Sequence, residues 1–365
     1  QNNAMFSEAS QSLLISKFGK LKPSLLFQFI IPLFLIFLSF NSYIQERESG
    51  RLKLLLVQGA SMEYVVFSKV LSIWLIGLIM LLFSICIQFI FNSNFIEFDM
   101  IIRLLFFVFS YSFYYLIIVL LTIFISLALR SATGALSLTM VVWVLWTIFL
   151  PKIIGNSVEK ISPLPSRVAF QNAMDSDRSK GIDGHNPSAE REGELIKETL
   201  AKYNVNNLEE LPVNFTGILM QADEEYGNKV WDKHFGDLYT QLQIQKMYYQ
   251  LSGFFNPFVS VQNLSMATSG TDMFHHLDFL KQAENYRRFF IKKLNDEYAF
   301  GGAKTGDRDW KADTEFFQSV KDFSYQFPSF ISFLSKYIVD IFLLFIWFFI
   351  LMLSTMFLSK KNTVL

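Results

Sequence analysis

The stretch from residue 46 to 61 reads Glu-Arg-Glu-Ser-Gly-Arg-Leu-Lys-Leu-Leu-Leu-Val-Gln-Gly-Ala-Ser, charged at first and then apolar. Uncharged sequence lies on both sides of it, at 25–40 and at 70–91. A helix of about 20 apolar residues crosses the hydrocarbon core of a bilayer, and we expect both flanking stretches to do so. The quoted stretch is therefore predicted to be a loop on one face of a membrane.

The rest of the chain separates charged from apolar sequence in the same way. Of its 365 residues 41 are Phe and only 18% are charged, a composition too apolar for a soluble protein of this length. Three more stretches, 104–129, 136–150 and 337–358, are almost free of charge, with Asp340 as the exception. The sequence predicts five membrane-spanning helices, of which the fourth is the shortest. Cys86 lies in the second span, where we expect it to act as a small apolar residue.

Lys and Arg in the short loops predict the orientation of the spans. If the 46–61 stretch is cytoplasmic, seven basic residues lie inside and four lie outside, which places the N-terminus outside and the C-terminus inside. The inner set is Arg47, Arg51, Lys53, Lys69, Arg130, Lys360 and Lys361, and the outer set is Lys17, Lys20, Lys22 and Arg103. The long polar stretch between the fourth and fifth spans is then extracytoplasmic.

The polar stretch is predicted to be mainly helical. Residues 186–211 are rich in Glu, Lys and Ala, and apolar residues recur at helical spacing through 214–253 and 274–298. Breaks are expected at Pro163, Pro257, Gly270 and Gly301. The predicted fold is an all-α membrane protein with this organisation: an outer segment 1–23, four spans in 24–154 with a cytoplasmic segment 45–69, an extracytoplasmic domain 155–330, a last span 331–358, and a cytoplasmic tail 359–365.

Several classes of function are excluded. A net charge of zero gives no basic footprint for nucleic acid. Gly301 and Gly306 have the outer spacing of a phosphate loop, but Asp307 and Arg308 stand where Lys and Ser or Thr are needed. The sequence also lacks Gly-x-Ser-x-Gly and His-Glu-x-x-His. We therefore expect no catalytic residue and no cofactor in this chain.

The weak candidates for a metal site are Asp272, His275 and His276. Adjacent His side chains diverge by about 100 degrees on a helix, whereas Asp272 and His276 can share a face. Ordinary polar helix residues explain the group as well, so the prediction is that no metal is bound.

Structural explanations are also preferred for other polar and aromatic residues. Asp340 can belong to a translocation path, but Lys336 lies four residues earlier and can pair with it. Glu284, Arg287 and Arg288 form a helical charge cluster, expected to be solvated or to make an internal salt bridge. Five aromatic residues can line a cavity, but core packing is the preferred interpretation: Tyr111, Tyr114, Tyr115, Trp143 and Trp146.

A family resemblance rests first on the 46–61 stretch. The run from Glu46 to Leu56, followed by Gly59 and by Lys69 at the start of the next span, resembles the cytoplasmic segment of type-2 ABC exporter permeases. The polar stretch resembles the uncharacterised extracytoplasmic domain of one bacterial branch of these permeases. The matching positions include Asn214, Gly217, Glu224, Asn256, Pro257, Asp272, His275, Glu284, Arg287 and Asn295.

The resemblance implies the permease subunit of an ATP-driven exporter in the bacterial inner membrane. Its implied partners are a cytoplasmic ABC ATPase dimer that binds ATP and Mg²⁺, a second permease, identical or related, and membrane lipid. An envelope or periplasmic protein is a further possible partner, because the alternative function is mechanical work on such a protein without transport of a solute. The family pattern has six spans, so a further span is expected upstream of the five visible ones.

The 46–61 stretch, called here the coupling segment, is expected to dock on the ATPase. Helical spacing places Leu52, Leu55, Leu56 and Gly59 on one face. A helix resting on the lipid surface is the alternative. The residues expected to make the contact are Glu46, Glu48, Gly50, Arg51, Leu52, Leu55, Leu56 and Gly59.

Overall fold

The computed structural model describes residues 23–91, 97–307 and 309–362. All regular secondary structure in these ranges is helical, which confirms the predicted fold class. The predicted outer segment 1–23 lies almost wholly outside the described residues, as do Arg308 and the last three residues of the predicted tail.

The described chain divides into two compact units. The helical unit contains Ser162–Ile244 and His276–Phe327. The membrane unit contains the helices up to Ile161 together with Gln245–His275 and the chain from Pro328 onward. The predicted domain 155–330 differs from this division, since residues 155–161, which continue the fourth span, and residues 245–275 and 328–330 fall in the membrane unit.

Among the residues that the structure describes, five helices are long and apolar enough to cross a membrane, as predicted. They are Pro23–Glu48, Met62–Ile87, Phe98–Ala128, Ala132–Ile161 and Phe330–Lys361. The prediction that the fourth is the shortest is wrong, because it has 30 residues and the first two have 26. Its helix continues past the apolar stretch through polar residues such as Asn156 and Glu159, which the search for uncharged sequence leaves out.

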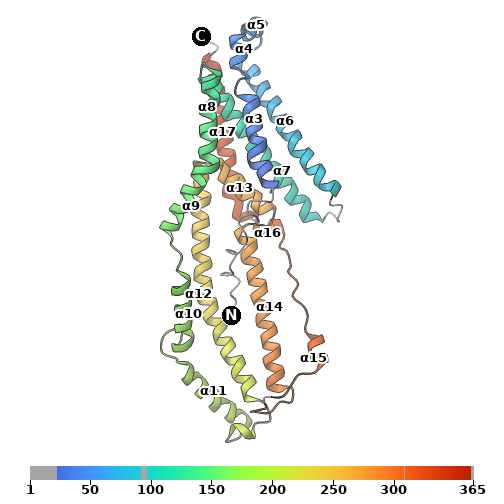
Figure 1. Ribbon diagram of the computed structural model, residues 1–365, viewed down its shortest axis with the longest axis vertical. Helices are drawn as coiled ribbons and strands as arrows, with labels where there is room; N and C mark the ends of the chain where they lie inside the picture. The colour runs from blue at the N-terminus through green and yellow to red at the C-terminus, as the bar shows by residue number, and fades with distance from the viewer. Residues whose placement is uncertain (1–22, 92–96, 308, 363–365) are drawn as a thin grey trace. The chain divides into compact units, whose positions relative to one another are not determined.

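The membrane unit is built from helices and short helical turns (Figure 1). They are α2 (Pro23–Leu25), η3 (Leu26–Ile30), α3 (Ile31–Ser39), α4 (Ile44–Glu48), α5 (Arg51–Val57), α6 (Met62–Phe91), α7 (Phe98–Ala128), α8 (Ala132–Val144), η4 (Leu145–Phe149), α9 (Leu150–Ile161), η6 (Ser252–Phe254), α13 (Pro257–Thr268), α16 (Phe330–Leu334), η7 (Ser335–Tyr337) and α17 (Ile338–Asn362).

Helix α7 is the centre of the membrane unit, in contact with α3, α6, α8, α13 and α17. Its Tyr111, Tyr114 and Tyr115 are fully buried in the apolar core. Trp143 and Trp146 are buried as well, so all five aromatic residues singled out in the sequence pack in the core. The hydroxyl groups of Ser110 and Thr122 on α7 donate to the carbonyl oxygens of Phe106 and Ile118 one turn earlier, and this satisfies both groups inside the bundle.

Helix α13 is a short buried helix that packs against α7 and α17. The predicted break at Asn256 and Pro257 is its start: the Asn256 side chain accepts from the backbone N–H of Phe258, and Pro257 occupies the first turn. The Asn256 amide also donates to the carbonyl of Trp146 in the π-helical turn η4, at 2.7 Å. That bond ties α13 to the fourth span.

The helical unit is made of helices from two separate stretches of the chain. They are α10 (Arg167–Lys180), α11 (Ser188–Tyr203), η5 (Leu208–Glu210) and α15 (Thr314–Ser319), with most of α12 (Phe215–Leu251) and of α14 (Met273–Phe300). The last turns of α12 and the first residues of α14 belong to the membrane unit. Within the helical unit α12 and α14 run side by side (Figure 1), joined by hydrogen bonds such as Asn295 to Gln221.

The charge cluster on α14 is an internal salt-bridge network. Glu284 is buried and pairs with Arg287 at 2.8 Å and with Arg288 at 2.9 Å. The two guanidinium groups also bind Glu224 and Asp232 of α12. Burial opposes ionisation of Glu284, but the hydrogen bonds from both Arg side chains outweigh it and hold its pKa below the usual range.

Two glycines of α12 test how closely α12 and α14 pack. A Cβ on Gly217 would lie 2.5 Å from the backbone nitrogen of Ala299, whereas nothing lies within 4 Å of one on Gly236. We expect Gly217→Ala to destabilise the helical unit by about 1–3 kcal/mol, and Gly236→Ala to stabilise it by roughly 0.5–1 kcal/mol. Thermal unfolding followed by circular dichroism measures the stability of both variants. Shifts of the same sign in their melting temperatures would contradict the close packing of Gly217 against α14.

Removal of the buried carboxylate tests the Glu284 network. Because its folded-state pKa lies below the unfolded one, its stabilisation is complete above the unfolded value and is lost as the pH falls through the folded value. Glu284→Gln is expected to cost about 3 kcal/mol at neutral pH and to flatten the loss of stability on the acid side. Urea unfolding at several pH values is the measurement. The control is Glu315→Gln at an exposed position, which should change neither the free energy of unfolding nor its dependence on pH.

Candidate functional site: the coupling segment and a buried polar network

The coupling segment includes the last residues of α4, at the end of the first span, and all of α5, between the first and second spans. Helix α4 ends at Glu48, and Gly50 follows with φ of 73°, a left-handed conformation that favours glycine and separates α4 from α5. Helix α5 ends before Gly59, whose φ is 92°. Figure 1 shows both helices at the same end of the membrane unit as the C-terminal end of α17.

The predicted docking face of the coupling segment lies against the chain's own core. Leu52 is buried in the core, and Leu55 and Leu56 are half-buried against it. The apolar residues that α5 exposes are instead Leu54, 60% exposed, and Val57, 86% exposed. Both glycines are exposed, as are Glu48 and Arg51, whereas the Glu46 side chain is largely covered. The face that helical spacing predicts to be buried lies against the chain's own core, and its contact with an ATPase stays a prediction.

Polar contacts fix the coupling segment to the spans. Lys69 of α6 pairs with Glu46 of α4 at 2.6 Å. Arg47 donates to the carbonyl oxygen of Arg130 at 2.8 Å, in the turn between α7 and α8. At the same end Lys360 of α17 pairs with Glu63 of α6 at 3.2 Å. The segment is thus bound to two different spans and is not a free loop.

A second feature of the membrane unit is a polar network buried among its helices. Its members come from α7, the last turns of α12, α13, the start of α14, η7 and α17. They are Arg103, Lys246, Gln250, Asn263, Asp272, His275, Tyr337 and Asp340.

Asp340 is fully buried and accepts hydrogen bonds from two amide groups. Asn263 donates to one carboxylate oxygen at 2.8 Å, and Gln250 donates to the other at 2.6 Å. Lys336, the partner considered from the sequence, is exposed and lies over the ring of Phe274 instead. A buried carboxylate in a span is costly without such partners, so the network holds α12, α13 and α17 together.

Lys246 adds a positive charge beside this carboxylate. Its ammonium group donates to the side-chain oxygen of Asn263 at 2.5 Å, so Asn263 bridges Lys246 and Asp340. Burial lowers the pKa of Lys246, and the carboxylates of Asp340 and Asp272 oppose that shift.

Asp272 and His275 form a buried pair at the start of α14. His275 Nδ1 binds one carboxylate oxygen of Asp272, and the other accepts from the Tyr337 hydroxyl and, at 3.0 Å, from the backbone N–H of Phe274. Burial opposes the charge of Asp272, but these hydrogen bonds hold its pKa below the usual range. His276 is exposed while His275 is buried. Within the described ranges no group of three potential ligands can hold a metal ion.

Arg103 joins the start of α7 to three other segments. Its guanidinium pairs with Asp99 at 2.6 Å and donates to the carbonyls of Pro328, at 2.8 Å, and Ala267, at 3.2 Å. His275 Nε2 lies 3.4 Å away. All these groups are acids, bases or amides engaged with one another, and the arrangement contains no nucleophile beside a free base. The network is suited to structural coupling between helices and not to covalent catalysis.

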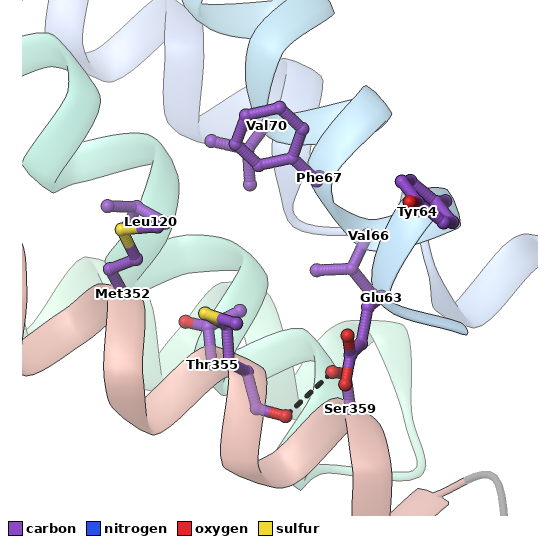
Figure 2. Close-up of a pocket in the computed structure, with 10 residues that line it drawn as sticks. Glu63, Tyr64, Val66, Phe67, Val70, Leu120, Met352, Thr355 and Ser359 are labelled. Atoms are coloured by element: carbon purple, nitrogen blue, oxygen red, sulfur yellow. Dashed lines mark hydrogen bonds between the residues drawn. The ribbon is translucent and has the colours of Figure 1, made fainter. Parts of the chain in front are cut away.

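A pocket of about 230 Å³ lies between α6, α7 and α17, near the coupling segment. Figure 2 shows Val66 and Val70 of α6 facing Leu120 of α7 and Met352 of α17, with Glu63 and Ser359 at one edge. The Ser359 hydroxyl donates to the Met356 carbonyl at 2.8 Å, and that of Thr355 donates to Leu351. The pocket is therefore mainly apolar, and the hydroxyl groups of Thr355 and Ser359 in its lining already donate to carbonyl oxygens.

Two family models match the chain. Residues 9–170 match the ABC-2 family transporter protein, and residues 167–326 match a model described as Domain of unknown function (DUF3526). The resemblance to ABC-2 permeases is confirmed. The permease therefore consists of an ABC-2 membrane domain followed by an added domain, and proteins of this family are non-catalytic membrane subunits. The family implies association with an ABC ATPase and usually with a partner permease. No curated protein and no solved structure matches the chain.

Sequence reasoning missed most of the polar network of this permease. Asp340 was visible as an acid in an apolar stretch, but Lys246, Gln250 and Asn263 carry no local pattern that sets them apart. The signal that could have indicated them is Asp340 itself, because a buried carboxylate needs hydrogen-bond donors. Amide side chains in segments that pack on α17 are the candidates for such donors.

Loss of the bridging amide tests the network. Asn263→Leu removes one donor from Asp340 and the acceptor of Lys246, so we expect it to cost about 3 kcal/mol of unfolding free energy. Gln262→Leu, next to it on α13, removes a single hydrogen bond with Tyr249 and should cost about 1 kcal/mol. Unfolding in detergent followed by intrinsic fluorescence compares them, and equal losses would refute the bridging role.

Proposed function

We propose that this permease is the membrane subunit of an ATP-driven exporter in a bacterial inner membrane, and that a separate ATPase docks on its coupling segment. The observation that carries the proposal is the pair of helices α4 and α5, bound to the ends of two spans and exposing Leu54 and Val57. We further propose that the ATPase moves these two helices and that their movement is passed to the spans.

The contacts of the coupling segment give a route for force. The Glu46–Lys69 pair connects α4 to the first part of α6, and the Arg47 hydrogen bond connects it to the turn before α8. Leu52 anchors α5 in the core beneath. A displacement of α4 and α5 by a partner is therefore passed to the second and fourth spans together.

The exposed face of α5 has the composition of a docking surface. Leu54 and Val57 lie three residues apart on one side of the helix, with Arg51 and Lys53 exposed nearby. Apolar anchors with a charged rim fit a groove on a partner protein. Seven basic residues at this membrane face support its assignment to the cytoplasm, where the ATPase binds ATP and Mg²⁺.

In the proposed mechanism two permeases, identical or related, form the transmembrane unit, and two ATPase subunits bind below them. ATP binding closes the ATPases and moves both coupling segments, and the spans then alternate between two arrangements. The added domain lies outside the membrane in this scheme and receives or gates the cargo.

A second function is work on an envelope protein without transport of a solute. The feature that favours it is the length of α12, 37 residues, and of α14, 28 residues, since each contributes to both units. Such continuous helices can transmit a displacement. Vesicles containing the permease and its ATPase distinguish the two functions, because ATP hydrolysis that accumulates no solute favours mechanical work.

Introduction of negative charge on the exposed face of α5 tests whether the ATPase docks there. The double variant Leu54→Glu and Val57→Glu places two carboxylates where the groove should be, and we expect it to reduce ATPase copurification and coupled ATP hydrolysis at least tenfold, about 1.4 kcal/mol or more. Phe317→Glu is the control, an equally exposed apolar residue in the helical unit. Unchanged copurification of the double variant would exclude this face. If the wild-type protein without its ATPase binds lipid vesicles and the double variant does not, the exposed face of α5 rests on the lipid surface instead.

A further inference from the structure

The helical unit contains a large pocket that the proposed function does not use. It lies between α11 and the first half of α12, with a volume of about 590 Å³. Clefts of roughly 300–1,000 Å³ are the usual size for sites that bind small molecules or short peptide segments. All of its lining residues belong to the helical unit, so the pocket is complete within that unit.

The floor of the pocket is apolar and its position is fixed. Leu195 of α11 and Leu219 of α12 are half-buried in it, beside Tyr226. The Tyr226 hydroxyl accepts from the backbone N–H of Ile182 at 2.7 Å, and the Arg191 guanidinium lies 3.6 Å over its ring. A ligand can therefore bury apolar groups against a floor that is already ordered.

The rim is strongly acidic. Five carboxylates line the pocket against two cations, and the carboxylates are Glu192, Glu194, Glu198, Asp223 and Glu225.

The two cations, Arg191 and Lys229, offset only part of that charge. Arg191 already donates to the carbonyls of Asn186 and Arg178 as well as covering Tyr226. Lys229 is exposed at the rim, and Asp223 pairs with Arg178 at 2.6 Å.

Three of the carboxylates remain without a counter-charge. Glu192, Glu194 and Glu198 are exposed, and in the described part of the chain none of them makes an ion pair. Glu194 and Glu198 are four residues apart on α11, a spacing at which like charges repel and destabilise a helix. Folding alone does not favour two like charges at this spacing, and a cationic ligand would relieve their repulsion.

The chemistry of the pocket excludes other ligands. Anionic ligands such as nucleic acids and phosphates are repelled by the rim. A bare divalent ion is also disfavoured, because no group of three acidic, His or Cys side chains in the described residues is close enough to coordinate one. Carboxylates spread along two turns of α11 fit a ligand with several separated positive charges, and the apolar floor fits one that also carries apolar side chains.

We propose that this pocket binds a basic, amphipathic peptide segment, with its Lys or Arg side chains on Glu192, Glu194 and Glu198 and its apolar side chains on Leu195, Leu219 and Tyr226. A role of this peptide as the cargo or signal of the permease extends the proposed function and rests on it. Its binding to the pocket does not depend on transport.

Fluorescence anisotropy of a labelled synthetic peptide tests the proposal. The full-length permease is placed in phosphatidylcholine nanodiscs, with empty discs as the blank, and no ATPase or nucleotide is added. The probes are a peptide of Lys and Leu, an analogue with Gln in place of Lys, and an analogue with Ser in place of Leu. Only the first is expected to bind well, and its affinity should fall as NaCl rises from about 0.05 to about 0.5 M, because salt screens exposed charges.

Matched variants localise the binding. The triple variant Glu192→Gln, Glu194→Gln and Glu198→Gln should bind the Lys and Leu peptide about tenfold more weakly. The control is Glu190→Gln, Glu209→Gln and Glu315→Gln, which removes the same charge from exposed positions of the helical unit outside the pocket and should bind as the wild type does. Similar thermal melts establish that both variants are folded.

Three results would overturn the proposal: no binding of the Lys and Leu peptide, equally tight binding of the Gln analogue, or equal affinity of the triple variant and its control. Since the assay contains no ATPase, any of these leaves the permease function intact. Loss of ATPase docking in the α5 variant would conversely leave peptide binding intact.

Discussion

The arrangement of the membrane unit depends on the hydrogen bonds that one buried carboxylate requires. Asp340 lies in a helix that is otherwise almost entirely apolar, and in such surroundings its charge requires donors from other segments. Gln250 and Asn263 provide them, and Lys246 reaches the same group through Asn263. This requirement fixes the last turns of α12 and the whole of α13 against α17.

The same constraint explains why residues 245–275 belong with the spans. In the linear sequence they lie within a polar stretch that separates two apolar regions. In the fold, α13 buries apolar side chains such as Phe258 and Leu264 against α7 and α17, and its Asn263 donates to Asp340 there. Arg103 and the Asp272–His275 pair extend this arrangement to the start of α14. Within the membrane unit these polar groups thus connect α7, α13 and α17.

At the other end of the spans, the coupling segment shows what an amphipathic pattern can and cannot tell. The spacing of Leu52, Leu55 and Leu56 indicated correctly that one side of the helix is buried. Periodicity carries no information about what covers that side, and here it is the chain's own core. The exposed residues, Leu54 and Val57, are the ones free to meet a partner. Membership of the ABC-2 permeases gives the expected partner, an ABC ATPase, and the geometry suggests how its movement reaches the second and fourth spans.

The sequence by itself determined the class of the protein, its five spans, the helical nature of the polar stretch and the family. These properties depend on local composition and period, because crossing a bilayer requires a long apolar helix whatever the rest of the chain does. Only the tertiary structure decided the end of the fourth span, the division into two units, the partners of Asp340, the pairing of Asp272 with His275, and the acidic pocket between α11 and α12. Asp272 and His275 are only three residues apart, and their pairing is a local contact. The division into units, the partners of Asp340 and the pocket depend on contacts between residues distant in the chain, such as Asn263 with Asp340 and Arg287 of α14 with Glu224 of α12. Such contacts leave no periodic trace in a single sequence.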